Sequence, residues 1–182
     1  MSTIGKLETV LARIDSALTT VAAISLFSIM LIIVSDVAMR YIFNSPYSWS
    51  YELIAMYLMT SLFFFCLSGT LAEDGHIAVD IFHIKMSRRS RHAALAVGYW
   101  LSCPLFGMIA WVSANNTWVS FIHNEFTAGE IPWPMWASLV CVPLGVIPLL
   151  ARILVRAIGH TLSAIKGGEL VGLPPISAHE SD

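Results

Sequence analysis

Residues 16–35 read SALTTVAAISLFSIMLIIVS, twenty residues without an acidic or a basic side chain. A helix rises 1.5 Å per residue, so about 20 apolar residues cross a hydrocarbon core of roughly 30 Å. The stretch is too long and too uniformly apolar for an ordinary amphipathic helix. It predicts a transmembrane helix over about residues 16–36.

Three further apolar runs of similar length follow along the chain. They predict spans over about residues 52–72, 93–115 and 132–152. The composition agrees, because 57% of the residues are hydrophobic, only 12% are charged and the mean hydropathy is +0.73. Soluble domains carry roughly 25% charged residues. We therefore expect an all-α integral membrane protein with four transmembrane helices, in which residues 1–160 form one four-helix membrane domain. A net charge of −2 is too small to indicate a nucleic-acid partner.

Short helices and a tail are expected outside the spans. Apolar residues recur at helical spacing over residues 4–14, which predicts either an interfacial helix or an extension of the first span. The isoleucines of residues 77–84 share a helical face, so a second interfacial helix is expected between the second and third spans. Residues 161–182 are expected to form a cytoplasmic tail, mobile from about residue 167.

Proline and serine predict local features of two helices. Pro143 and Pro148 fall inside the fourth span, where neighbouring helices can satisfy the freed carbonyl groups, and we expect kinks near both. Ser45 as N-cap and Pro46 at the first helical position predict that a short lead-in to the second span begins there.

The positions of the basic residues predict the topology. Cytoplasmic flanks hold the excess of positive charge, and nine of the ten bases fall on one side of the predicted spans. The exception is Arg40. Both termini are therefore predicted to be cytoplasmic. The bases between the second and third spans are the expected topology determinants and can also attract anionic membrane lipids: Arg88, Arg89 and Arg91.

Aromatic residues mark the opposite interface. Trp and Tyr favour the headgroup level, where the ring is half buried and its polar atom is wetted. Tyr47, Trp133 and Trp136 follow the first span or open the fourth, so we expect them at the outer interface.

Asp36 and Arg40 are four residues apart and share a helical face if the first span continues through them. One interpretation is an interfacial ion pair that anchors the helix end. A second is a structural polar network in which Arg40 also meets Glu52. A third is a direct role in binding a ligand or partner.

Histidine and cysteine, which often serve as catalytic residues or metal ligands in proteins, form no catalytic or metal-binding pattern in this sequence. His76 and His83 are seven residues apart, which is a weak signal for a metal. Three cysteines, each in an apolar run, predict packing rather than disulfides or zinc. We expect no catalytic, substrate-binding or metal-binding residue, no cofactor and no enzyme activity.

Together these motifs resemble the small permease subunit, DctQ-like, of tripartite ATP-independent periplasmic (TRAP) transporters. The resemblance covers most of residues 15–156 and rests on the order and spacing of its pieces. Segment 131–145, with Ile131-Pro132, Trp136 and Pro143-Leu144-Gly145, is similar to the fourth-helix region of the family. The residues that match the first two family signatures are Asp36, Arg40, Tyr41, Pro46, Trp49 and Glu52, then Gly75, His76 and Asp80.

The resemblance implies a role that spacing alone does not supply. Such a subunit pairs with a large permease (M subunit) as a heterodimer, and a periplasmic substrate-binding protein (P subunit) associates transiently. The system lies in the bacterial inner membrane and imports an organic acid by secondary active transport, usually by sodium symport. The small subunit is expected to be a scaffold. The absence of charge in the middle of every predicted span agrees, since intramembrane ionisable groups usually mark an ion or substrate pathway.

Two alternatives come from other functional classes. A free-standing small exporter would keep a carboxylate within a span, and Glu52, at a span end, is the only candidate. A membrane redox subunit would need axial haem ligands facing each other inside the bundle, whereas all six histidines lie outside the predicted spans or at their ends. A homodimer without a larger partner would favour the exporter, and a Soret band would favour the redox subunit.

Overall fold

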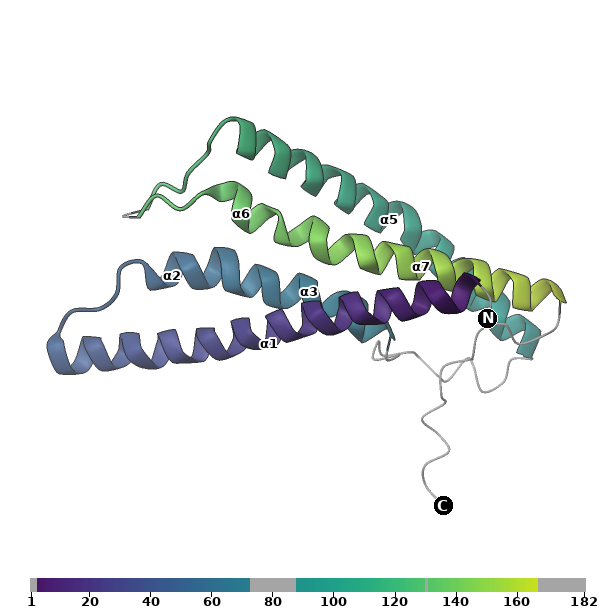
Figure 1. Cartoon of the computed structure of the whole chain (residues 1–182), viewed down its shortest axis with the longest axis horizontal. Helices are drawn as coiled ribbons and strands as arrows, with labels where there is room; N and C mark the ends of the chain where they lie inside the picture. Colours follow the sequence, from purple (N-terminus) through teal and green to yellow (C-terminus); the bar gives the residue numbers. More distant parts are fainter. Residues whose placement is uncertain (1–2, 73–87, 130, 167–182) are drawn as a thin grey trace, which may run out of the picture.

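The computed structural model describes residues 3–72, 88–129 and 131–166, and the side chains within 9–72, 89–129 and 131–165. Within these ranges the chain forms four long helical rods (Figure 1). Each rod is long and apolar enough to cross a membrane, which confirms the four predicted spans. The rods are α1 (Thr3–Phe43), then α2 (Ser50–Glu52) with the π-helix η1 (Leu53–Leu58) and α3 (Met59–Ala72), then α5 (Arg88–Ile122), and finally α6 (Met135–Leu139) with α7 (Cys141–Lys166).

The first rod is one continuous helix of 41 residues, α1. Of the two predicted alternatives for residues 4–14, the structure has the extension of the first span. These residues do not form a separate interfacial helix. Asp15 and Asp36 are 21 residues apart on α1, which is about 31 Å along a helix and close to the thickness of the hydrocarbon core. We use them to name the two ends of the molecule, the Asp15 end and the Asp36 end.

The turn after α1 differs from the prediction. Asn44 adopts a left-handed φ of 53°, which ends the helix, and the N–H of Ser45 donates to the carbonyl oxygen of Met39 at 3.3 Å. The N–H of Ser45 therefore closes the end of α1, and the second rod begins only at Ser50. The predicted N-cap at Ser45 was wrong, because Ser45 hydrogen-bonds to the end of the preceding helix and does not begin the next one.

Pro143 coincides with an interruption of the fourth rod. A proline lacks the N–H that would reach the carbonyl group four residues earlier and its ring crowds that carbonyl, here of Leu139. The structure separates α6 from α7 at Val140, directly after Leu139. By contrast, α7 continues through Pro148 and on to Lys166, beyond the predicted domain boundary at residue 160. The remaining tail and the predicted interfacial helix at 77–84 lie outside the described residues.

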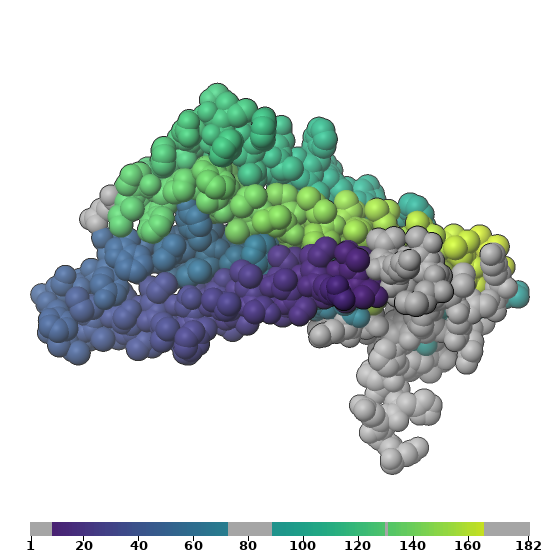
Figure 2. Space-filling model, in the orientation of Figure 1, coloured from purple at the N-terminus to yellow at the C-terminus, as the bar shows by residue number. Residues whose placement is uncertain are grey.

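The rods lie side by side in the order α1, α3, α7, α5 (Figure 1). Figure 2 shows α1 along one edge of the molecule and α5 along the opposite edge. A small core of Leu71, Leu149 and Ile153 sits where α3, α7 and α5 meet, with Tyr99 and Phe106 packed against it. The arrangement is an open layer rather than a closed bundle, so α7 in the middle is the most enclosed of the four spans.

Small residues bring neighbouring rods into close contact. Ser25 of α1 hydrogen-bonds to Ser61 of α3 at 3.0 Å between the two hydroxyls, and both are buried. Gly145 of α7 lies against the backbone carbonyl group of Phe64 in α3, with no room for a side chain. Such close approach at small residues is typical of helix packing in membranes, where apolar burial alone does not drive association.

Large apolar side chains cover the outside of the layer. Ile24 and Val34 of α1 are 61% and 62% exposed, and Leu101 and Trp111 of α5 are 71% and 77% exposed. In water such a surface would favour aggregation. It is the surface expected where lipid tails or another membrane protein surround the helices.

Candidate functional site

The Asp36 end holds the first polar cluster. Asp36 accepts a hydrogen bond from the backbone N–H of Tyr47 at 2.7 Å and pairs with Arg40 at 3.2 Å. Trp49 stacks on Tyr47 with ring centroids 5.3 Å apart. Asp36 therefore fixes the turn between the first two rods, as an anchoring role requires. Tyr41, at the end of α1, is 83% exposed and Pro46 is exposed in the turn.

Glu52 stands apart from this cluster. The predicted extension of the network from Arg40 to Glu52 does not form, because Arg40 pairs with Asp36 and its side chain is otherwise 60% exposed. The Glu52 carboxylate instead lies against Gly129 of the loop before α6. Its Oε2 atom is fully buried and has no hydrogen-bond partner among the described residues.

The loop that covers Glu52 is held by backbone contacts at both of its ends. Phe126 and Pro134 form an isolated antiparallel bridge, and the N–H of Thr127 donates to the carbonyl oxygen of Trp133 at 2.9 Å. Tyr57 of η1 donates its hydroxyl to the carbonyl oxygen of Pro134 at 2.6 Å. The second rod and this loop are thereby joined directly.

The predicted interface aromatics gather at this end. Trp133 packs against Tyr57 with ring centroids 5.9 Å apart, and its indole Nε1 is buried without a partner among the described residues. Trp136 is partly exposed and meets Phe121 edge to face. The structure therefore places Tyr47, Trp133 and Trp136 at one end of the layer.

The Asp15 end contains an ion pair that the sequence analysis missed. Arg152 of α7 donates to the Asp15 carboxylate of α1, and the two side chains are only 11% and 7% exposed. Asp15 and Arg152 each flank a predicted span at the same membrane end, so the signal was present. Pairing them, however, requires knowing that α1 and α7 touch at that end.

A second polar contact at the Asp15 end joins three rods. Arg156 of α7 donates to the hydroxyl of Tyr99 in α5 at 3.2 Å and to the carbonyl oxygen of Ala72, the last residue of α3, also at 3.2 Å. Unsatisfied carbonyl groups at a helix C-terminus favour a cation. Arg156 therefore stabilises the end of α3 as well as the α5–α7 contact.

His92 and His160 also meet at the Asp15 end. Their Nδ1 atoms are 3.0 Å apart, both side chains are buried, and the ring of Tyr99 stacks on His160. One imidazole must donate and the other accept. Two axial ligands lie on opposite faces of a haem, so imidazoles in direct contact cannot serve as such a pair. This contact was also missed, since the two residues are 68 positions apart.

The other predicted residues lie at the Asp15 end or outside the described residues. α5 begins at Arg88, Arg89 is exposed and Arg91 is buried. Gly75, His76 and Asp80 lie outside the described residues. Cys66, Cys103 and Cys141 are free and half buried, as packing residues would be.

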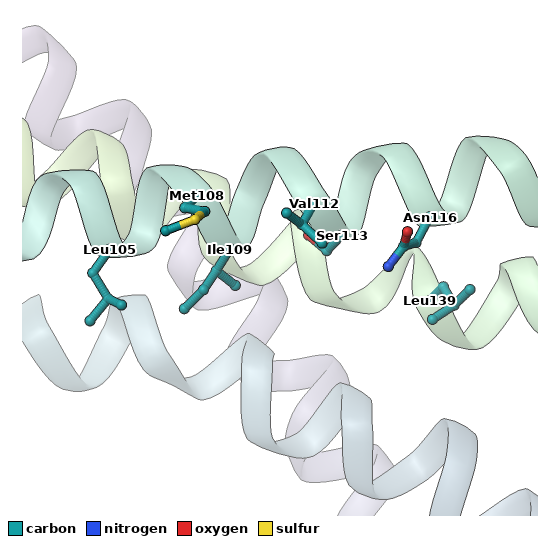
Figure 3. A pocket seen from close by; sticks show the side chains of 7 residues that line it. All are labelled: Leu105, Met108, Ile109, Val112, Ser113, Asn116 and Leu139. Atoms are coloured by element: carbon teal, nitrogen blue, oxygen red, sulfur yellow. The ribbon is translucent and has the colours of Figure 1, made fainter.

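A groove opens between α5 and α6 and has a volume of about 360 Å³ (Figure 3). Leu105, Met108 and Val112 line it from α5, Leu139 lines it from α6, and Asn116 lies near Leu139. None of its lining residues is charged. It therefore offers no group of the kind that pairs with a carboxylate.

The sequence comparison decides the family. A family model described as tripartite ATP-independent periplasmic transporters, DctQ component, matches residues 29–164 of the 182-residue chain. The chain belongs to the DctQ family. DctQ proteins are the small membrane subunits of TRAP transporters, so this chain is a transporter component and associates with other TRAP components. The match begins within α1, ends two residues before the end of α7, and confirms the resemblance read from the motifs. No curated protein and no solved structure matches this DctQ chain.

Proposed function

We propose that this chain is the scaffold of a TRAP transporter, partnering the large permease in sodium-driven symport of an organic acid. The carrying observation is the placement of charge. Asp15, Arg152 and Arg156 lie at one end of the rods and Asp36, Arg40 and Glu52 at the other, while the segments between hold no charged residue. Ion and substrate pathways usually need ionisable groups at membrane depth, so the transport site belongs to a companion chain.

The open layer supports the heterodimer. Its two edge helices, α1 and α5, carry exposed apolar residues along their length, and a second membrane protein can pack against either edge. The buried polar contacts within the layer resist deformation, because each of them would lose a partner if the rods separated. A rigid partner against which a mobile permease moves needs both properties.

We also propose that the Asp36 end faces the periplasm of a bacterial inner membrane and contacts the substrate-binding protein transiently. The distribution of bases supports this orientation. Alkaline phosphatase fused after residue 182 is expected to be inactive, and a green fluorescent protein fused there is expected to fluoresce. The opposite pattern would reverse the orientation and leave the Asp36 end in the cytoplasm.

The scaffold role predicts a division of labour in transport. Liposomes that contain this chain alone are expected to take up no organic acid under a sodium gradient. The large permease with its binding protein is expected to lose most uptake when this chain is omitted, because the mobile part then lacks its fixed partner. Radiolabelled uptake measures both. Full uptake without this chain would contradict the scaffold role, and uptake by this chain alone would contradict the charge argument.

A further inference from the structure

The Glu52 carboxylate has no counter-ion among the described residues. Its Oε2 atom is buried and unpartnered among the described residues, and Gly129 lies directly on the carboxylate. A buried charge without a partner is costly, and the cost is relieved when a cation or several hydrogen-bond donors reach it.

Among the described side chains, no arginine or lysine pairs with Glu52. Arg40 is the base at the Asp36 end, and it already pairs with Asp36. Arg152 and Arg156 lie at the other end, where they contact Asp15 and Ala72. The Asp36 end also carries an exposed Glu125, so its excess charge is negative. This imbalance favours a cation from outside the chain.

Two backbone features lie next to the Glu52 carboxylate. Gly129 has no side chain, and a Cβ atom at this position would overlap the Glu52 carboxylate. Residue 129 therefore covers the carboxylate with backbone alone. The π-helix η1 begins directly after Glu52, and π-turns inside helices are frequent at functional sites. Both features set Glu52 apart from an ordinary helix-end acid.

We propose that Glu52 is the ionic anchor for a lysine or arginine side chain of the large permease, at the level of the membrane surface. The proposal rests on the proposed function, because it needs that permease as partner. The partner's base would pair with the Glu52 carboxylate beside Gly129. This contact would fix the register between the two subunits.

Glu52→Gln tests the anchor, with Glu125→Gln as the matched control. In the isolated full chain, Glu52→Gln is expected to raise Tm, because it removes an unpaired, partly buried charge while keeping the shape of the side chain. In the complex it is expected to weaken association with the permease by roughly tenfold or more, since truncating a buried charge pair mainly accelerates dissociation. Glu125→Gln, an exposed acid at the same end, is expected to change neither quantity.

The outcomes separate the anchor from the proposed function. If the unaltered chain does not co-purify with the permease, the proposed function fails. If it does, but Glu52→Gln co-purifies equally well or lowers Tm of the isolated chain, only the anchor fails. A rise in Tm of the isolated chain in sodium chloride over choline chloride, lost in Glu52→Gln, would assign the site to a sodium ion instead. Recovery of Glu52→Lys by an acid replacing one permease base would identify the partner residue.

Discussion

Replacing Gly145 with valine is expected to separate α3 from α7 and to prevent the chain from accumulating in a folded form. A Cβ atom at residue 145 would overlap the backbone carbonyl group of Phe64, which cannot rotate away as a side chain would. Overpacking costs about 1–3 kcal/mol and sometimes more, and each kcal/mol shifts Tm by roughly 2–4 °C in a chain of this length. We therefore expect Gly145→Ala to lower Tm by about 2–12 °C in detergent, and Gly145→Val to lower it further.

Gly107 provides the matched control. It lies in α5 with nothing within 4 Å of a Cβ atom, and alanine favours a helix over glycine. Gly107→Ala is therefore expected to leave Tm unchanged or slightly raised. Equal effects of alanine at residues 107 and 145 would show that the α3–α7 crossing is looser than the structure has it.

Replacing Arg152 with methionine is expected to be strongly destabilising, because it leaves the Asp15 carboxylate buried and unpaired. Breaking one side of a buried ion pair costs about 3–5 kcal/mol. Replacing both partners by apolar residues is often neutral, so Asp15→Leu combined with Arg152→Met is expected to recover most of the loss. Unfolding of the purified chain by a denaturing detergent measures the four members of this double-mutant cycle.

The exposed pair at the other end gives the control. Arg40→Met removes a cation whose side chain is 60% exposed and leaves Asp36 bonded to the N–H of Tyr47. Exposed pairs contribute about 0–1 kcal/mol, so a small effect is expected. If Arg152→Met costs no more than Arg40→Met, the Asp15–Arg152 pair is solvated and does not tie α1 to α7.

The four spans could be predicted because crossing the hydrocarbon core is a one-dimensional requirement. The segment of residues 16–35 had to be apolar and about 20 residues long, whichever helices it packs against. The helix boundaries were less predictable. Ser45 looked like the start of a helix, but its N–H closes α1, and which helix uses a polar residue depends on the path of the turn.

The polar sites divide in the same way. Asp36 and Arg40 were predictable as a pair, because residues four positions apart on a helix are neighbours on the same face by geometry alone. Asp15 with Arg152, and His92 with His160, join residues 137 and 68 positions apart. Their pairing depends on which rods touch, and a hydropathy pattern carries no such information.

The amino-acid order alone determined that the chain crosses a membrane four times, because the bilayer accepts only segments that satisfy their own backbone and carry few charges. Its motifs also determined the DctQ family. Only the packed structure decided that the rods form an open layer, that Arg152 neutralises Asp15, and that Glu52 has no counter-ion among the described residues. The physical reason is that the hydrocarbon core constrains the composition of each helix separately, whereas an ion pair between helices depends on which helices are in contact.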